Sequence, residues 1–323
     1  MELYPIKFTP IFKYRIWGGN KLKTVLNKEY DQEHVGESWE ISDVKGDETV
    51  VGEGDLAGKT LGDLIKSYKE AVVGAHVYKT FGDEFPLLIK FIDAETPLSI
   101  QVHPSNEIAK ERHNSFGKNE MWYVMEAEKD AELIVGFNQA VDKTSYVDAL
   151  NSGKILDILN NDKVSKGDTY YIPTGRIHAI GAGVMLAEIQ QTSDITYRIY
   201  DYERVDATTG KTRELHTDLA VDVIDYSFDS NYKTNYNIAE NETNTLVHSP
   251  YFKTNIINIK GELKKDYSKL DSFVIYICVE GALEIVCNHK TYKVSKGETI
   301  FLPAALNNIE LKADNADILE VYY

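Results

Sequence analysis

Residues 164–178 read Val-Ser-Lys-Gly-Asp-Thr-Tyr-Tyr-Ile-Pro-Thr-Gly-Arg-Ile-His, and residues 294–308 read Val-Ser-Lys-Gly-Glu-Thr-Ile-Phe-Leu-Pro-Ala-Ala-Leu-Asn-Asn. The two stretches share Val-Ser-Lys-Gly, the following Thr and the Pro, and they differ conservatively at Asp168, Tyr171 and Ile172. Each copy predicts a turn at a glycine, then a strand, then a proline that ends the strand at its rim. The chain therefore contains an internal repeat of one β-structural unit.

The two copies differ where chemistry is expected. His178 in the first copy aligns with Asn308 in the second, and Gly175 aligns with Ala305. If a metal ion binds at the first copy, the second copy has lost a ligand. We therefore expect one active unit and one structural unit.

Short apolar runs separated by turns surround the first copy of the repeat. They predict strands at Leu87–Ile92, Leu98–Val102, Met121–Met125, Glu132–Phe137, Thr169–Ile172, Val184–Ile189 and Ile195–Tyr202. Residues 246–323 are again strand-like, after a polar stretch at 228–245 that predicts a linker. Many short strands with Gly and Pro turns indicate a mainly β fold of barrels or sandwiches.

Helical spacing of apolar residues is limited to three places. We expect a helix within 60–80 with Thr60 as its cap, a short helical insert at 140–162, and a helix at about 216–227.

Composition narrows the range of partners. A chain of 323 residues predicts two domains. The formal net charge of −16 excludes nucleic acid as the expected partner and disfavours an acidic membrane surface. A small anion can still bind if a few cations line one cleft.

Targeting signals are not visible, so we expect a cytoplasmic protein. The N-terminus has no basic start followed by an apolar run, and no apolar stretch approaches the roughly 18 residues of a membrane span. Cys278 and Cys287 flank a turn predicted at Glu280–Gly281 that would not place them opposite each other. We expect no disulfide, which suits a reducing compartment.

Four polar side chains near the repeat predict a metal site. In the strand Leu-Ser-Ile-Gln-Val-His-Pro (98–104), alternation puts Gln101 and His103 on one face. Glu120 opens the next strand, and His178 comes from the repeat. Two imidazoles, a carboxylate and an amide oxygen suit Zn²⁺, and this donor set also admits Fe²⁺, Co²⁺ and Mn²⁺.

These motifs resemble those of a known family. The run Gly167-x₅-Pro173-x-Gly175-x₂-His178 matches the second cupin motif. The first cupin motif is altered, because Gln101 replaces its first His and sixteen residues separate His103 from Glu120. This altered form resembles the type I, zinc-dependent mannose-6-phosphate isomerases in their short bacterial form. Further similar stretches lie at 16–19, 36–42, 97–104 and 181–204.

The resemblance implies a fold and a domain division. The fold would be mainly β, with tandem cupin (jelly-roll) β-barrels and a small helical insert. Residues 1–227 would form the catalytic, metal-binding cupin domain, including the insert near 140–162. Residues 228–323 would form a C-terminal cupin-like barrel that lacks metal ligands.

The resemblance also implies the roles of individual residues. One divalent ion, with Zn²⁺ favoured, would be held by Gln101, His103, Glu120 and His178. The catalytic residues would be Arg198, Lys118 and Asp194, and the substrate-binding residues would be Lys90 and Ser99, which would hold the substrate's phosphate. A divalent ion and three basic side chains would then surround one small anion, in agreement with the charge argument.

The implied reaction interconverts mannose 6-phosphate and fructose 6-phosphate by metal-assisted proton transfer through an enediol. Lys118 and a metal-bound water both remain open as the base. Two alternatives remain: another cupin enzyme, such as an iron-dependent oxygenase or a different sugar-phosphate isomerase, and a non-catalytic sugar-binding cupin. Gln101 disfavours the oxygenase because it removes a usual iron ligand. The oligomeric state stays open.

Overall fold

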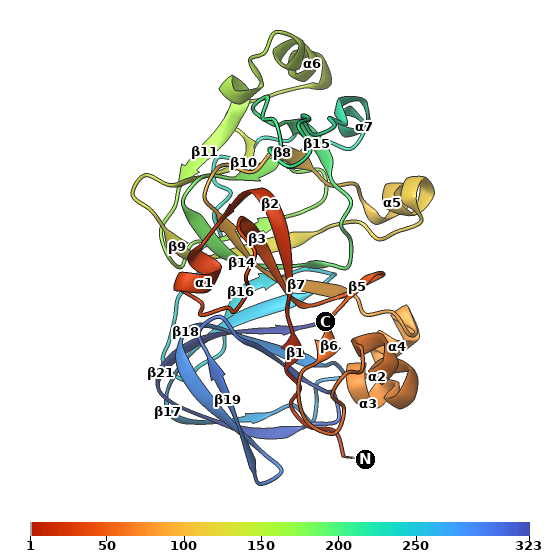
Figure 1. Ribbon diagram of the computed structural model, residues 1–323, viewed down its shortest axis with the longest axis vertical. Helices are drawn as coiled ribbons and strands as arrows, with labels where there is room; N and C mark the ends of the chain where they lie inside the picture. Colours follow the sequence, from red (N-terminus) through yellow and green to blue (C-terminus); the bar gives the residue numbers. More distant parts are fainter. Residues whose placement is uncertain (1) are drawn as a thin grey trace.

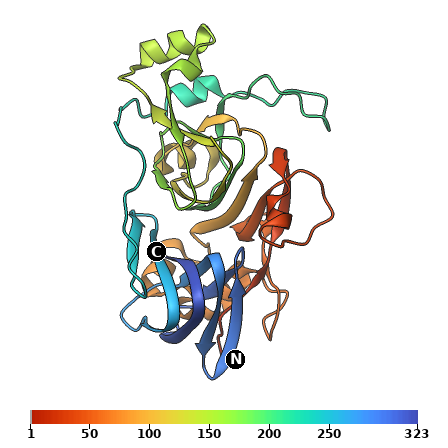
Figure 2. The same cartoon turned by 90° about the vertical axis from the view of Figure 1, so that its left-hand side faces the viewer.

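The computed structural model describes residues 2–323 and is mainly β, as the sequence predicts (Figure 1). Two stacked bodies of strands form the molecule, one built mostly from residues before 240 and the other from the C-terminal strands (Figures 1 and 2). Within the described residues no helix is long and apolar enough to cross a membrane.

Two sheets form the first body, and every pairing within them is antiparallel. The larger sheet has the order β12 (Thr169–Ile172), β9 (Glu120–Ala127), β14 (Val184–Gln191), β7 (Leu87–Ala94), β2 (Ile11–Gly19), β3 (Val35–Ile41). The smaller sheet has the order β11 (Leu159–Lys163), β10 (Glu132–Phe137), β13 (His178–Ile180), β8 (Ile100–Val102), β15 (Tyr197–Tyr200).

One sheet forms the second body. Its order is β16 (Asn244–His248), β17 (Lys253–Asp266), β21 (Asn308–Tyr322), β18 (Val274–Cys287), β19 (Lys290–Ser295), and β20 (Thr299–Leu302) also pairs with β18. Two small ribbons complete the strands: β1 (Phe8–Thr9) with β6 (Val50–Val51), and β4 (Asp43–Val44) with β5 (Asp47–Glu48).

The helices lie outside the sheets and modify the predictions. They are α1 (Lys21–Thr24), α2 (Leu61–Tyr68), α3 (Glu70–Val73), α4 (Ala75–Phe81), α5 (Asn106–His113), α6 (Lys143–Asn151), the 3₁₀ turn η1 (Ile155–Ile158) and α7 (Thr217–Val221). Thr60 caps α2 as predicted, since its hydroxyl accepts from the Asp63 N–H. Residues 60–80 are helical as predicted, but Lys69 (φ 49°) and Gly74 (φ 93°) break this stretch into three helices.

Two further helical predictions were too long. The insert predicted at 140–162 contains α6 and η1, but its end belongs to strand β11. The helix predicted at 216–227 is limited to α7.

The cysteine prediction is partly wrong. Both cysteines are free and buried, as expected. Glu280–Gly281 is not a turn, however, because Cys278 and Cys287 lie on the same continuous strand β18. Gly281 has φ 73° and marks a register shift inside the strand, where a Cβ would lie 2.3 Å from the Asn315 carbonyl oxygen. Positive φ at a glycine therefore marked a bulge and not a hairpin.

The pairing registers show that the internal repeat extends well beyond the two similar segments. In the first body Glu188 of β14 lies opposite Trp122 of β9. In the second body Glu320 of β21 lies opposite Tyr276 of β18. The same carboxylate–aromatic pair thus occupies the same place in each body.

Four repeat-related side chains join the two bodies. Lys166 and Lys296 occupy equivalent positions in the two copies of the repeat, and Glu126 and Glu280 occupy equivalent positions on β9 and β18. Lys296 Nζ lies 2.8 Å from Glu126 and 3.1 Å from Glu280, and Lys166 contacts the same two carboxylates. Each lysine therefore pairs within its own body and across the junction, as an approximate two-fold relation requires.

The hydrophobic core also crosses the junction. One buried cluster includes Ile6 near the N-terminus, Phe91 of β7 and Phe301 of β20. The backbones of Ile6 and Phe301 exchange two hydrogen bonds of 2.8 Å. The N-terminal segment therefore ties the two bodies together.

Candidate metal centre and active site

Cross-strand pairing in the smaller sheet assembles one side of the site. Gln101 of β8 lies directly opposite His178 of β13 on one side and Arg198 of β15 on the other. Residues opposite each other on antiparallel neighbours have side chains about 5 Å apart on one face. Three residues far apart in sequence thus form one row.

The two histidines and Glu120 meet at the inner end of this row. His103 Nε2 lies 3.1 Å from His178 Nε2. The Glu120 carboxylate, from β9 of the other sheet, lies 3.3 Å from His178 Nε2 and 3.6 Å from His103 Nε2. The Gln101 amide lies 3.2 Å from His178 Nε2. These four side chains are within reach of one small ion.

Backbone carbonyls fix both imidazole rings. His103 Nδ1 donates to the Ile195 carbonyl and His178 Nδ1 donates to the Arg176 carbonyl, each at 2.9 Å. The Nε2 atoms that face each other are therefore unprotonated acceptors. Burial lowers the pKa of His103 well below its usual range, and it lowers the pKa of His178 to about 3. Both rings are neutral, as metal ligands must be.

Glu120 is an acid without adequate hydrogen bonds. Neither carboxylate oxygen, both fully buried, accepts a hydrogen bond of good geometry from the described residues, although Lys118 Nζ lies 2.7 Å from Oε2. Burial and the neighbouring Glu188 carboxylate raise the pKa of Glu120 to about 7, although Lys118 opposes this shift. Two converging imidazole acceptors and an unsatisfied buried carboxylate leave room for a cation. The residues fit a bound divalent ion.

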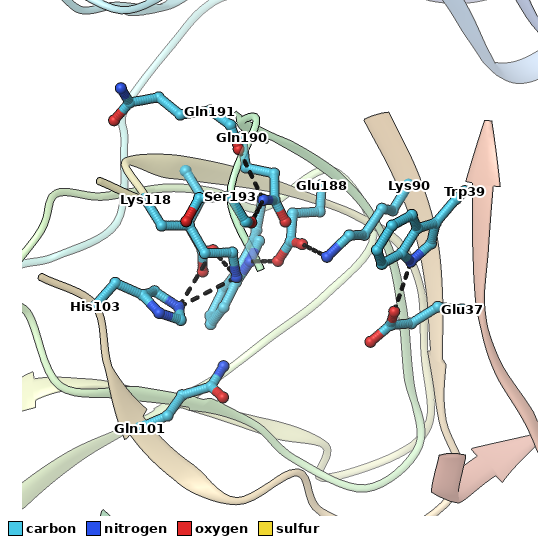
Figure 3. Close-up of polar contacts among 12 residues, drawn as sticks. Glu37, Trp39, Lys90, Gln101, His103, Lys118, Glu188, Gln190, Gln191 and Ser193 are labelled. Atoms are coloured by element: carbon cyan, nitrogen blue, oxygen red, sulfur yellow. Dashed lines mark hydrogen bonds and ion pairs between the residues drawn. The ribbon is translucent and has the colours of Figure 1, made fainter. Parts of the chain in front are cut away.

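Charged side chains of alternating sign, buried except for the half-buried Arg15, extend outward from this centre, and Figure 3 labels Lys118, Glu188, Lys90 and Glu37 among them. In order toward solvent they are Glu120, Lys118, Glu188, Lys90, Glu37 and Arg15. We call this set the charge ladder.

The middle of the charge ladder is closely packed. Lys90 Nζ lies 3.1 Å from Glu188 Oε1, and the Trp122 indole N–H donates to Glu188 Oε2 at 2.9 Å. The ring of Trp39 lies against Lys90 Nζ at 5.2 Å and donates its N–H to Glu37 at 2.7 Å. These contacts fix Lys90 between two carboxylates.

Glu37 is strongly ionised despite full burial. Burial would raise its pKa, but Lys90, Arg15 and the hydrogen bonds from Arg15 and Trp39 outweigh it and lower the pKa to about 2. At neutral pH Glu37 is therefore negatively charged, between the positive charges of Lys90 and Arg15.

The ladder forms a wall of a cavity of about 580 Å³. The predicted site residues that line this cavity are Lys90, Ser99, Gln101, Lys118, Asp194 and Arg198. The other three, His103, Glu120 and His178, are buried beside it. All nine residues named from the sequence therefore surround one space.

Individual side chains in this space differ in how they are held. Lys90 and Lys118 are buried and paired with Glu188 and Glu120. The Arg198 Nη1 donates to the Glu214 carbonyl at 2.8 Å, whereas its buried Nε has no partner. Asp194 is exposed at the cavity rim.

The sequence predicts site roles for the lysines of the ladder but not for Glu188, Glu37 and Arg15. Glu188 and Glu37 lie within the similar stretches 181–204 and 36–42, and Arg15 lies outside them. The available signal was one acidic residue inside an otherwise apolar run, as at Glu188 within 184–189. A charge in such a strand must be paired if it is buried.

The fold and the site together define a two-barrel cupin protein with a buried His/Glu/His set of the kind that holds a divalent ion. Two family models match the chain: phosphomannose isomerase type I, catalytic domain, over residues 6–140, and mannose-6-phosphate isomerase, cupin domain, over residues 242–322.

Relatives of full length agree with these models. The chain is 35% identical to mannose-6-phosphate isomerase ManA of Bacillus subtilis, over 97% of each chain. It is 33% identical to mannose-6-phosphate isomerase of Streptococcus mutans, over 93% of this chain and 92% of the relative. The crystal structure of the mannose 6-phosphate isomerase from Bacillus subtilis superposes with a TM-score of 0.89 at 34% identity, covering 99% of this chain and all of the other. The chain belongs to the type I mannose-6-phosphate isomerase family.

Proposed function

We propose that the protein interconverts mannose 6-phosphate and fructose 6-phosphate, the activity for which its family is named. The observation that supports this most strongly is the position of the His103, Glu120 and His178 set at the inner end of a cavity lined by basic side chains. A sugar phosphate needs polar groups at its reacting carbons and cations at its phosphate. A non-catalytic sugar-binding cupin would leave the grouping of Lys90, Lys118 and Arg198 around the same cavity unexplained.

In this proposal Gln101, His103, Glu120 and His178 hold one divalent ion, and we propose Zn²⁺ because nitrogen donors and one carboxylate suit it. When bound, the ion supplies positive charge that stabilises the oxygens of the enediol as proton transfer proceeds. The imidazole orientations are set by the Ile195 and Arg176 carbonyls, so the ligand set is preorganised.

Lys118 acts as a charged donor to the substrate oxygens. Burial would lower its pKa, but Glu120 and Glu188 outweigh burial and raise it. In its charged form its proposed role is to hold the C1 and C2 oxygens while charge develops. Arg198, which retains a buried N–H without a partner, contributes a second donor on the opposite wall.

Asp194 is the proposed proton acceptor. Four other acids line the cavity: Glu37, Asp47 and Glu188 form ion pairs, and Asp206 accepts backbone hydrogen bonds. Among the acids that the described residues contribute to the lining, Asp194 is the one without such a bond. It can take the C2 proton of mannose 6-phosphate and return it to C1, while Lys90 and Ser99 hold sugar hydroxyls.

We further propose that residues 1–227 form the catalytic domain and that residues 228–323 form a barrel without metal ligands. The alignment of the two copies of the repeat supports this, because Asn308 aligns with His178. The two domains nevertheless share a hydrophobic core, since one buried cluster contains residues of both. We further propose a cytoplasmic location, where phosphorylated sugars are made and free cysteines such as Cys278 stay reduced.

The test is metal analysis joined to an isomerase assay. Purified protein is assayed for fructose 6-phosphate formation as isolated, after chelation, and after addition of Zn²⁺, Mn²⁺, Co²⁺ or Fe²⁺. His178→Ala should lose both bound metal and turnover. His76→Ala, which replaces an exposed histidine on α4, should keep both. A metal-loaded wild type that leaves mannose 6-phosphate unchanged would refute the proposal.

Isomerisation in D₂O tests the mechanism separately. Proton transfer through Asp194 predicts solvent deuterium at C1 of fructose 6-phosphate or C2 of mannose 6-phosphate. Product free of deuterium at every extent of reaction would instead favour a direct hydride shift and weaken this mechanism.

A further inference from the structure

Two buried amide side chains lie next to the proposed site without lining its cavity. Asn119 stands between Lys118 and Glu120 in the chain and is 3% exposed. Gln191 is the last residue of β14 and is 6% exposed. The Asn119 N–H and Nδ2 both donate to Gln191 Oε1, at 3.0 and 2.7 Å, and the Gln191 N–H donates to the Asn119 carbonyl at 3.1 Å. We call these two residues the amide clasp.

Two further stretches of the chain are attached to the amide clasp. The Asn119 Oδ1 accepts from the Thr174 N–H at 3.1 Å, in the loop between β12 and β13. The Gln191 Nε2 donates at 3.1 Å to Asn106 Oδ1, at the start of α5. The same Asn106 oxygen accepts from the Gly117 N–H at 2.8 Å. Four stretches that are separate in sequence therefore meet at the clasp, at residues 106, 117–119, 174 and 191.

Backbone N–H groups fix the orientation of each amide. Because a backbone N–H only donates, the side-chain atoms that face the N–H groups of Asn119, Gly117 and Thr174 are oxygens. The amide nitrogen of Asn119 then points to Gln191, and that of Gln191 points to Asn106. Turning any one of these amides over would leave a backbone N–H without its acceptor. The network therefore has one arrangement.

Each of the four stretches carries a residue of the proposed site. The site residues that lie within four positions of a member of this network are His103, Lys118, Glu120, His178 and Asp194. The Gly175 N–H also donates to the His103 carbonyl at 2.9 Å, so two of the stretches are joined directly. The clasp thus connects the backbone segments that present the two histidines and the acids.

The sheets alone do not hold Lys118 and Asp194. Strand pairing of β9 begins at Glu120, and pairing of β14 ends at Gln191. Lys118 therefore lies before the paired part of its strand, and Asp194 lies after the paired part of β14. At these positions the side-chain amides satisfy backbone groups that the regular ladder does not reach.

Gln190 links the clasp to Asp194 (Figure 3). The Gln190 side chain is fully buried, and its Nε2 donates to the carbonyls of Gln191 and Ser193 at 2.9 and 2.6 Å. The Ser193 N–H also donates to the Gln191 carbonyl at 2.8 Å. Because this turn is closed on itself, the position of Gln191 sets the position of Asp194 at the cavity rim.

We propose that Asn119 and Gln191 are positioning residues for the isomerisation. They hold Lys118 and Asp194 at the separation that proton transfer requires, and Asn119 keeps Glu120 directed toward the other proposed ligands. This inference rests on the proposed function. Neither amide lines the cavity, so both act through the groups that they orient. A displacement of about 1 Å between reacting groups lowers a rate by as much as about 100-fold, so loss of the clasp affects turnover more than substrate affinity.

The experiment removes these hydrogen bonds at nearly constant side-chain volume in the full-length protein. Asn119→Leu and Gln191→Met each remove one amide of the clasp. Asn106→Leu removes the outer oxygen, whereas Asn106→Asp keeps an oxygen that accepts from Gly117 and Gln191. Asn255→Leu is the matched control, because Asn255 is a buried amide of the second body, 2% exposed, that makes its own side-chain hydrogen bond of 2.9 Å.

Three properties are measured for each variant: kcat and KM for mannose 6-phosphate at saturating Zn²⁺, the Kd for Zn²⁺ by competition with a chelator, and Tm. Loss of the clasp should lower kcat about 10- to 100-fold, while KM changes less than about threefold. The Kd for Zn²⁺ should increase about tenfold, because hydrogen bonds behind metal ligands orient them. Asn106→Asp should keep most of the kcat that Asn106→Leu loses, and Asn255→Leu should lower Tm alone.

The inference is wrong if kcat stays within about threefold of wild type in Asn119→Leu and Gln191→Met, whatever their Tm. Equal losses of kcat in Asn106→Leu and Asn106→Asp would also contradict it, since the shared oxygen would then have no role. Asn106 is half-buried, so Asn106→Leu should fold even where Asn119→Leu does not, and its kcat then decides. If wild type shows no isomerisation, the proposed function fails separately. The Kd values for Zn²⁺ of Asn119→Leu and Asn255→Leu then still decide whether the clasp orients the ligands.

Discussion

Replacing Glu188 by Gln tests whether the charge ladder behaves as one electrostatic unit. Glu188 and Lys90 are 3% and 5% exposed, and their charged atoms are 3.1 Å apart. Removing one member of a buried ion pair costs about 3–5 kcal/mol, because the other charge remains buried. The Gln amide oxygen still accepts a hydrogen bond from Lys90 or from the Trp122 N–H, and this bond reduces the loss of stability by about 1 kcal/mol.

We therefore expect Glu188→Gln to lower the free energy of unfolding by about 2–4 kcal/mol. For a chain of this size, that corresponds to a decrease in Tm of roughly 3–6 °C. Urea unfolding followed by circular dichroism measures the free energy, and calorimetry measures Tm. Glu128→Gln is the matched control, since its carboxylate pairs with Lys21 but is 65% exposed, and it should change stability by less than about 0.5 kcal/mol.

The double variant Lys90→Met/Glu188→Gln separates charge from packing. It removes the stranded ammonium, so it should be more stable than Glu188→Gln by at least about 1 kcal/mol. If the effects of the two substitutions simply add, the ladder is not an electrostatic unit and the reasoning is refuted.

Three further outcomes follow from the described contacts. Glu120→Gln removes the one anionic member of the proposed ligand set and should reduce bound metal per chain at least tenfold by elemental analysis, with the fold retained by circular dichroism. The pKa of Glu37 is about 2 in the fold against an ordinary 4.5, so its contribution of about 3 kcal/mol exists above pH 4.5 and is lost as pH falls toward 2. The difference in Tm between wild type and Glu37→Gln should thus shrink from pH 6 to pH 3, and a constant difference would contradict the ionised state. Gly136→Ala should destabilise the protein by about 2 kcal/mol or more in urea, because Gly136 has φ 70° and its Cβ would lie 2.3 Å from the Tyr232 ring.

The fold could be predicted because its signals are local. A repeated Gly turn, an alternating strand and a terminal Pro occur within 15 consecutive positions, and both copies form the strands that they predict, β12 and β20. Helix ends were less predictable, because the break at Lys69 depends on one residue with positive φ. Apolar spacing continues across such a break without a change.

The metal set could be predicted for a similar reason. Gln101 and His103 are two positions apart near one strand, and His178 follows a motif whose geometry is fixed by Gly175. The ladder could not be predicted in this way, because the contact between Glu188 and Lys90 depends on the register between β14 and β7. That register depends on eight residue pairs between the two strands and on the core that they form. A short sequence motif carries no information about it.

The same register argument bears on the proposed difference between the two barrels. Glu320 occupies in the second body the place that Glu188 occupies in the first. There the carboxylate accepts from the Tyr267 hydroxyl at 2.5 Å and pairs with Lys265 at 2.7 Å, and both residues come from the end of the neighbouring strand and its following turn. A bulky phenol and a lysine thus fill the interior and satisfy the acid locally. Around Glu188 the corresponding stretch carries Gln101 and a short strand, and the acid, paired with Lys90 and Trp122, lines a cavity of about 580 Å³. In the second body, Tyr267 and Lys265 pack around Glu320 and stabilise the interior of the barrel. In the first body, the corresponding interior stays open as the cavity in which we propose that the substrate binds.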